Sequence, residues 1–426
     1  MIKSYKKIYH ELFKSKYLKN LFILTSGVSI SQFIPLLLLP ILTRFFTPLD
    51  FGLFALFMAI IQLLAITTTL RLEVAVVLPK KDSDAILLCL MSFFFLLFFS
   101  VIIFLLLLLI SSYMPHDTYT KFSLNGIMIY LIPIGACSLG LYNILYSWNN
   151  RLELYHNMSY SQITHSLIST PSSILLYFSS YQAFGLIIGQ LLGRIIACLL
   201  LLKSIIVGIN SLNILHMRHD AYILLKKYQR FILFETPQSI LNFLCQKYIV
   251  GFFSAFFGLS VLGLFDLADK IIGKPLGIIS NSFKTVFYKR LTTAKDKISI
   301  FKKSVILMTF ISFLLTIPFY LIPDSFFIIL LGSEWVDTGK YIKLICPFLF
   351  VRFIFNVVSP SISYTLQNQY LLIWQIIYFL LLVLLFLLVK NLNVESVLLL
   401  YSFFGVIMYA FLGLISFFLL KNHISN

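Results

Sequence analysis

Charged residues are scarce in this sequence: Asp, Glu, Lys and Arg make up 12% of the 426 residues, about half the share in ordinary soluble domains. Hydrophobic residues make up 60%, and 44 phenylalanines raise the aromatic share to 16%. A soluble globule of this size could not bury so much apolar surface, because much of its surface must face water. The composition excludes a soluble enzyme, a disordered regulator and a secreted disulfide scaffold, and it predicts a polytopic membrane protein.

Residues and motifs for metal, redox and nucleotide chemistry are also few. The five cysteines lie in or beside apolar stretches without metal-ligand spacing, which favours small core residues over a disulfide framework. His216 and His219 lack accompanying carboxylates for a metal site. The two Gly-Lys dipeptides, at 273–274 and 339–340, lack the upstream glycine and the following hydroxyl of a P-loop. We therefore expect no catalytic residue, no metal and no cofactor, with energy from a proton or sodium gradient or from removal of the product.

Long apolar runs are abundant. A transmembrane helix needs about 20 mainly apolar residues, and twelve such runs are present. They cover residues 18–43, 51–78, 85–110, 122–147, 155–178, 183–206, 229–255, 259–283, 304–322, 344–367, 369–389 and 396–420. The short connections leave no room for a catalytic domain outside the membrane.

Basic residues are unevenly distributed between these runs. With the N-terminus in the cytoplasm, 23 of the 33 Lys and Arg residues fall on the cytoplasmic side, five on the opposite side and five within spans. Such a bias sets the orientation of membrane proteins. It predicts that both termini are cytoplasmic, and it accounts for the net charge of +17 without nucleic acid as a partner.

One internal repeat divides the chain. Residues 45–56 (FFTPLDFGLFAL) and 256–267 (FFGLSVLGLFDL) share six identities, among them Gly52 and Gly263 at an offset of 211. The offset contains six spans, so the two copies run in the same direction, as in parallel-repeat transporters. We predict an all-α integral membrane protein of about twelve transmembrane helices. These form two parallel-repeat six-helix lobes, 1–210 and 211–426, around a central cavity, with a linker near 207–220.

Ionisable residues at membrane depth are costly and mark functional sites. The eighth span carries Asp266, Lys270 and Lys274 on one helical face, with Asp269 beside them. A wet cavity between the first, second, seventh and eighth helices would accommodate these charges. Its cations suit an anionic group such as a phosphate, and its acids could take up a coupling proton or sodium ion. The predicted substrate-binding residues are Lys247, Lys270, Lys274, Arg352, Arg44, Gln238 and Asn242, and the predicted ion-coupling residues are Glu235, Asp266 and Asp269.

Three other polar features have simpler interpretations. The serine-rich stripe of the fifth span, which has no charge, favours helix–helix hydrogen bonding. Arg44 lies near the outer end of the first helix, where snorkelling competes with substrate binding as its explanation. Arg71 and Glu73 are two residues apart, so on a helix they would not face each other, and each is expected to need another partner.

Five stretches, in order, carry a family resemblance. They are LPILTRFFTPLDFGLFAL (39–56), RLEVAVVLPKKDSDA (71–85), GLFDLADKIIGKPLGII (263–279), VFYKRL (286–291) and LLGSEWVDTGKYIKLICP (330–347). Together they resemble Wzx-type flippases for O-antigen and other polysaccharide repeat units, within the multidrug/oligosaccharidyl-lipid/polysaccharide exporter (MOP) superfamily. The residues that match family landmarks are Arg44, Gly52, Glu73, Pro275, Glu334 and Trp335. The entry to the seventh span, YQRFILFETPQ (228–238), lacks a proline that is frequent in the family, so its bend is left open.

The resemblance implies two six-helix bundles around a cationic cavity in the bacterial inner membrane. The implied substrate is an undecaprenyl-diphosphate-linked oligosaccharide, moved from the cytoplasmic to the periplasmic leaflet by alternating access. Membrane lipids, a polymerase and a chain-length regulator are the implied partners. A cation-coupled drug exporter of the same superfamily is one alternative. A membrane-embedded glycan polymerase or ligase is another, although Asp82-Ser83-Asp84 lies in a short turn and does not favour catalysis.

Overall fold

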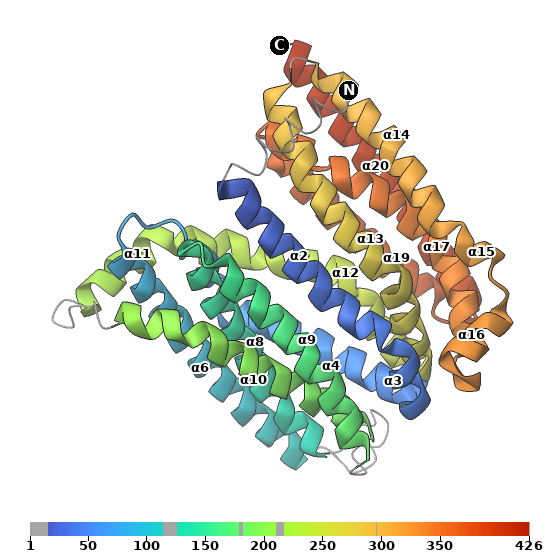
Figure 1. Cartoon of the computed structure of the whole chain (residues 1–426), viewed down its shortest axis with the longest axis horizontal. Coiled ribbons are helices and arrows are strands. Elements are labelled where there is room, and N and C mark those ends of the chain that lie inside the picture. Colours follow the sequence, from blue (N-terminus) through green and yellow to red (C-terminus); the bar gives the residue numbers. More distant parts are fainter. Residues whose placement is uncertain (1–15, 114–125, 179–181, 210–216, 295, 426) are drawn as a thin grey trace. The chain divides into compact units, whose positions relative to one another are not determined.

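A computed structural model describes residues 16–113, 126–178, 182–209, 217–294 and 296–425, and within these ranges the regular structure is entirely helical (Figure 1). Twelve of the helices in these ranges have 20 residues or more, which confirms the predicted all-α class. They are α2 (Lys16–Leu37), α4 (Pro48–Thr68), α6 (Asp82–Tyr113), α8 (Gly126–Arg151), α9 (Tyr155–Tyr177), α10 (Gln182–Ile209), α12 (Thr236–Phe256), α13 (Leu259–Thr293), α14 (Lys297–Thr316), α17 (Val336–Val358), α19 (Asn368–Val389) and α20 (Val394–Ser425).

Shorter helices connect or extend these long ones. They are α3 (Leu39–Phe45), α5 (Leu72–Ala75), α11 (Met217–Arg230), the π-helix η2 (Phe231–Glu235), α15 (Pro318–Leu321), α16 (Asp324–Leu331), the 3-10 helix η3 (Ser333–Trp335) and α18 (Pro360–Tyr364). Proline at the first or second position begins α3, α15 and α18. Proline lacks an N–H and has a helical φ, so it interrupts the preceding helix and starts a new one.

Ten helical segments among the described residues are long and apolar enough to cross a membrane, so the chain is a multi-pass membrane protein. The two remaining long helices, α9 and α13, are 23 and 35 residues long, and they differ from the other ten because they are more polar. At a rise of about 1.5 Å per residue, either could still span a hydrocarbon core of about 30 Å. The serines of α9 and the charges of α13 therefore need partners inside the protein.

Packing divides the chain into two compact units. The N-terminal unit comprises Met1–Pro35 and Phe57–Ile240, and the C-terminal unit comprises Leu36–Leu56 and Leu241–Asn426. The end of α2, α3 and the first part of α4 thus group with the C-terminal unit, whereas α11, η2 and the start of α12 group with the N-terminal one. The lobe boundary at residues 210 and 211 stays a prediction, and half of the predicted linker, residues 210–216, lies outside the described residues.

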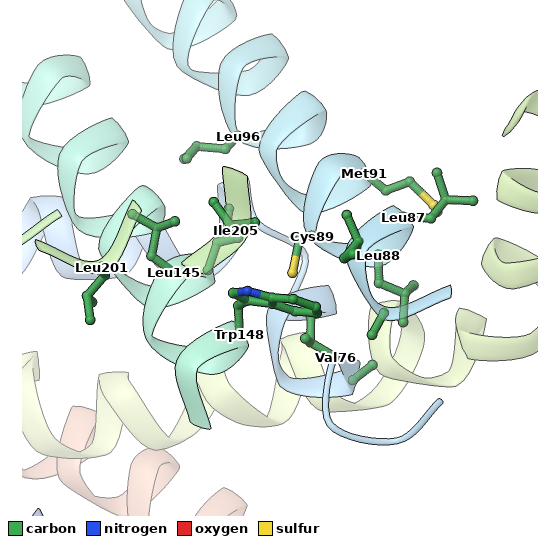
Figure 2. Close-up of a cluster of buried hydrophobic side chains, with 14 of the residues drawn as sticks. Val76, Leu87, Leu88, Cys89, Met91, Leu96, Leu145, Trp148, Leu201 and Ile205 are labelled. Carbon is green, nitrogen blue, oxygen red and sulfur yellow. The ribbon is translucent and has the colours of Figure 1, made fainter. Parts of the chain in front are cut away.

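The core of the N-terminal unit surrounds Trp148 of α8, whose side chain is 2% exposed (Figure 2). Leu88 and Cys89 of α6 and Leu201 and Ile205 of α10 belong to the same buried cluster. A buried aromatic residue of this size contributes a large apolar contact area. It therefore fixes α6, α8 and α10 as one packed group.

The serine stripe of α9 serves helix packing, as its lack of charge predicts. The Ser159 hydroxyl donates to the Ile23 carbonyl oxygen of α2 at 2.9 Å, and the Ser166 hydroxyl donates to that of Ser31 at 2.6 Å. On the side facing α10, a β-carbon at Gly193 would lie 2.6 Å from the His165 carbonyl oxygen. Small residues allow this close approach between helices in a bilayer.

In the C-terminal unit, α17 packs against both α13 and α20, and the two copies of the sequence repeat contact each other. A β-carbon at Gly52 would overlap the carbonyl oxygen of Leu259, and one at Gly263 would overlap that of Pro48. Pro48 and Leu259 are separated by the same 211 residues as Gly52 and Gly263. Equivalent atoms that meet reciprocally are the mark of a local two-fold axis. The contact therefore supports the repeat predicted from sequence.

Candidate functional site

The ionisable face of α13 forms one cluster in the C-terminal unit. Asp266 is buried, Lys270 is half-buried and Lys274, one further turn along, is exposed. Lys270 Nζ lies 2.5 Å from Asp266 Oδ2, and the two side chains are 26% and 11% exposed. The spacing of four residues places them on the same face, as predicted. Lys270 is thus neutralised within its own helix.

Two aromatic rings hold the same ammonium group from another helix. Lys270 Nζ lies 5.6 Å from the ring centroid of Phe51 and 5.2 Å from that of Phe54, both in the first part of α4. A cation over an aromatic face is attracted to its negative quadrupole. The two rings and the Asp266 carboxylate together restrict the position of Lys270, which leaves it little freedom to follow a ligand.

Lys274 differs from Lys270 in its surroundings. Its charge interacts with those of Lys247 and Lys270, which repel it, and with those of Asp266 and Asp269, which attract it. Among the described residues it forms no ion pair, and its side chain is exposed. A lysine held near other cations, with its three donors free, is suited to an anionic oxygen ligand. Of the predicted lysines, Lys274 is therefore the one best placed to contact an anion.

Arg352 lies on α17, which packs against α13, and it is surrounded by tyrosine side chains. Its charge interacts with those of Asp269 on α13 and of three tyrosines, Tyr378, Tyr401 and Tyr409. The rings of Tyr378 and Tyr409 have centroids 6.1 Å apart. Asp269 thus interacts with both Arg352 and Lys274. The sequence did not single out these tyrosines, because tyrosine within an apolar span is not distinguishable from an ordinary core aromatic.

The polar stripe predicted for the seventh span is split between the two units. Glu235 and Gln238 belong to the N-terminal unit, whereas Asn242 and Lys247 belong to the C-terminal unit. Asn242 is exposed, and its Oδ1 accepts a hydrogen bond from Gln246 Nε2 at 3.2 Å. The segment without the family proline forms the π-helix η2, which ends at Glu235. A π-helical turn is itself an irregularity typical of functional sites, so this helix is irregular without the proline.

Arg71 and Glu73 do form a pair, so the expectation that they would not face each other is wrong. Leu70 and Arg71 have φ angles of 51° and 55°, in the left-handed region, and the chain there is not a continuous helix. Arg71 Nη1 consequently lies 3.3 Å from Glu73 Oε1, and Arg71 Nη2 lies 4.0 Å from Glu235 Oε1. Burial raises the pKa of the Glu73 carboxyl above its usual range, and the Arg71 charge offsets part of that rise.

Two family landmarks join separate segments of the C-terminal unit. Arg44 Nη2 donates to the carbonyl oxygen of Ile329, and Trp335 Nε1 donates to that of Thr43 at 3.1 Å. These bonds fasten α3 to α16 and η3. Arg44 is exposed and lines an apolar groove with residues of α3 and α16, none of which belongs to the lysine cluster. Its role in substrate binding stays a prediction.

The described residues contain no group of three or more His, Cys, Asp or Glu side chains that could hold a metal ion. What the C-terminal unit does hold is a set of partly compensated charges: three lysines, one arginine and two acids. Such a set can bind an anion, and its carboxylates can exchange a small cation.

A family model described as polysaccharide biosynthesis protein matches residues 41–340, more than two thirds of the chain. A search of curated proteins finds no match. The fold is similar to that of the lipid II flippase MurJ in an inward closed conformation, with a TM-score of 0.64 and 17% identity over 96% of this chain and 91% of that one.

The fold is also similar to that of multidrug resistance MATE family transporters of the MOP superfamily. An inward-facing structure gives a TM-score of 0.60 with 12% identity over 95% of each chain, and an outward-facing one gives 0.59 with 15% identity over 96% of each. Identities this low show a shared fold. The chain is thus a multi-pass membrane protein that belongs to the polysaccharide biosynthesis protein family and has the fold of MOP-superfamily transporters.

Proposed function

We propose that this protein is a flippase for undecaprenyl-diphosphate-linked oligosaccharide repeat units. It moves them from the cytoplasmic to the periplasmic leaflet for O-antigen or another surface polysaccharide. The observation that carries the proposal is Lys274, an exposed lysine on the long helix α13 with two further lysines close by. The membership in a polysaccharide biosynthesis family supports a glycan as cargo.

The diphosphate is the part of the substrate that the lysines recognise. Phosphate oxygens accept strong charge-assisted hydrogen bonds from ammonium groups. Lys274 makes the direct contact, while Lys247 adds positive potential nearby. Because Lys270 is already paired with Asp266, it serves mainly to shape the site. The polyprenyl tail stays in lipid, and the glycan is carried through by alternating access of two lobes.

The acids supply a route for ion coupling. Asp269 interacts with both Lys274 and Arg352, so the arrival of an anion at Lys274 changes the electrostatic environment of this carboxylate. A proton or sodium ion bound at Asp269, Asp266 or Glu235 would then be linked to the substrate. Transport by an Asp266→Asn/Asp269→Asn double variant, with unaltered pH and sodium dependence, would remove these acids from the mechanism.

The setting is part of the same proposal. The bias of basic residues favours cytoplasmic termini, and the resemblance to Wzx-type flippases implies the bacterial inner membrane, with a polymerase and a chain-length regulator that use the delivered repeat units. Since no P-loop is present in the sequence, transport is driven by an ion gradient or by consumption of the product.

The test of this function is a deletion strain complemented with defined variants. We expect lipid-linked repeat units to accumulate on the inner leaflet in the deletion, with drug sensitivity unchanged. Lys274→Gln should fail to restore surface glycan at normal protein levels. Lys302→Gln, which removes an exposed lysine from α14 in the same unit, should restore it fully. Increased drug sensitivity without accumulation would instead favour the drug-exporter alternative.

A further inference from the structure

The N-terminal unit contains an intramembrane cation that the proposed diphosphate site does not use. Arg194 lies in α10, on the same buried stripe as Leu191, Cys198 and Leu201. The side chain therefore points into the unit and not toward lipid. An arginine in this position needs a partner, since charged groups at membrane depth pair with other groups or line polar cavities.

Arg194 is too deep to reach either membrane surface. The candidate span runs from Ala183 to Gly208, which places Arg194 about 16 Å from one end and about 21 Å from the other at a rise of about 1.5 Å per residue. Snorkelling carries the charged heads of arginines near helix ends to the interface. That explanation does not apply in the middle of a span, so the guanidinium must be stabilised locally.

The local stabilisation includes no carboxylate. The sequences of α8, α9 and α10 contain neither Asp nor Glu. The guanidinium carbon of Arg194 lies 5.1 Å from the ring centroid of Tyr142. Among the described residues the guanidinium has no hydrogen-bond acceptor, and the side chain is half-buried. Five N–H donors thus remain available.

A second unpartnered group accompanies the guanidinium. His165 of α9 is half-buried, its charged form interacts with Arg194, and its Nε2 atom is buried without a hydrogen-bond partner among the described residues. A buried ring nitrogen without a partner is uncommon and indicates a missing ligand or water. Both groups would be satisfied by one polar ligand that carries negative charge.

Hydroxyl and amide groups extend from this pair toward α2. The Tyr142 and Ser161 hydroxyl oxygens are 3.3 Å apart, and Gln162 Nε2 donates to the Tyr146 hydroxyl at 3.0 Å. The rings of Tyr142 and Tyr146 lie 5.7 Å apart. Aromatic walls with a few polar groups are typical of small-molecule sites. These hydroxyl, amide and aromatic groups suit a sugar better than a bare inorganic ion.

We propose that Arg194 and His165, beside Tyr142, form a second anion site that takes a carboxylate or phosphate oxygen carried on a sugar. The assignment rests on the proposed function, because the acidic sugar belongs to the transported glycan. The guanidinium holds the oxyanion in a planar, bidentate manner, and the tyrosine and glutamine groups contact the sugar hydroxyls. The lysines of α13 hold the diphosphate separately.

The test measures ligand binding by the full-length protein in nanodiscs, from shifts of its melting temperature. The probes are glucuronate, glucose 6-phosphate, glucose and farnesyl diphosphate. We expect wild type to bind glucuronate or glucose 6-phosphate at least tenfold more tightly than glucose. Arg194→Gln should lose that preference, whereas Lys203→Gln, which removes an exposed charge from the same helix, should keep it. The two acidic probes distinguish a carboxylate from a phosphate as the preferred group.

Equal binding of glucose and both acidic sugars by wild type, or unchanged affinity in Arg194→Gln, would overturn the proposal. If Arg194→Gln does not fold, Arg194→Lys decides the matter. It keeps the charge but loses the planar donors, so glucuronate affinity should fall at least threefold, and unchanged affinity contradicts the site. Failure of the proposed function would give a different result: wild type would bind the acidic sugars but not farnesyl diphosphate.

Discussion

The two units stabilise their intramembrane cations in opposite ways. In the C-terminal unit, Lys270 has Asp266 at 2.5 Å and two phenylalanine rings over its ammonium group. In the N-terminal unit, Arg194 has one tyrosine ring and no acid on α8, α9 or α10. A paired cation is compensated by the protein itself, whereas an unpaired one depends on something that binds. A direct ion pair with an acid therefore distinguishes the restrained Lys270 from Arg194, which has no such pair among the described residues.

The largest effect is expected from breaking the pair in the C-terminal unit. Asp266→Asn or Lys270→Gln leaves a partly buried charge without its partner, which should lower the free energy of unfolding by about 3 kcal/mol. The double variant should cost less than the sum of the two, because neither charge then remains alone. A double-mutant cycle on melting in detergent measures this coupling. Strict additivity would show that the pair is not coupled.

The next largest loss of stability is expected at Gly52 and Gly263, where the two copies of the repeat contact each other. Alanine at Gly52 or at Gly263 would overlap a backbone carbonyl oxygen of the other copy, so each variant should lose about 2–3 kcal/mol of stability through overpacking. Because the contact is reciprocal, the two losses should be nearly equal.

The matched control for these glycines is Gly251 of α12, where an added β-carbon meets no atom within 4 Å. Gly251→Ala should leave stability unchanged or raise it by up to about 1 kcal/mol, since alanine is the better helix former. Clearly unequal losses at Gly52 and Gly263 would contradict the local two-fold symmetry.

Removal of the unpaired cation Arg194 should not lower the free energy of unfolding, in contrast to removal of the paired Lys270. Arg194→Leu leaves no carboxylate without a partner, so the free energy of unfolding should stay within about 0.5 kcal/mol of wild type or rise. Transport of an acidic glycan should nevertheless fall. Thermal unfolding and transport, measured on the same preparation, check both expectations. Destabilisation as large as that of Lys270→Gln would erase the contrast between the units.

The smallest effect is a pH dependence outside the spans. Burial raises the pKa of Glu73 above its ordinary value, so the folded state binds this proton more tightly than the unfolded state does. The resulting stability is fully present below the unfolded pKa and is lost as pH rises through the folded pKa. Glu73→Gln should therefore flatten the decline in melting temperature above about pH 4.5. A decline of equal slope in the variant would assign the effect to another group.

Much of this architecture can be predicted from the sequence. The length of an apolar run identifies a membrane helix, and identical residues at a fixed offset identify the repeat. The i,i+4 pair of Asp266 and Lys270 follows from helical spacing alone. The Arg71–Glu73 pair does not, since it depends on two consecutive left-handed residues that no local pattern requires. Helical periodicity is informative only where the chain stays helical.

The site residues divide in the same way. Lys270 and Lys274 can be recognised in the sequence as charges within an apolar run. Only the structure shows that Lys270 is restrained by Asp266 and that Lys274 is exposed. Arg194 is equally visible in the sequence. Its importance became apparent only when the neighbouring helices proved to be acid-free and His165 proved to lack a partner. Which helices are neighbours is a property of tertiary packing.

The most direct test of the flippase account uses proteoliposomes that contain a fluorescent undecaprenyl-diphosphate-linked oligosaccharide. Loss of fluorescence after addition of a membrane-impermeant quencher reports how much substrate has reached the outer leaflet. We expect rapid equilibration across the bilayer with wild type and with Lys302→Gln, and at least a tenfold slower rate with Lys274→Gln. Equal rates in Lys274→Gln and wild type, or no movement with wild type, would contradict a diphosphate-binding role for this lysine cluster.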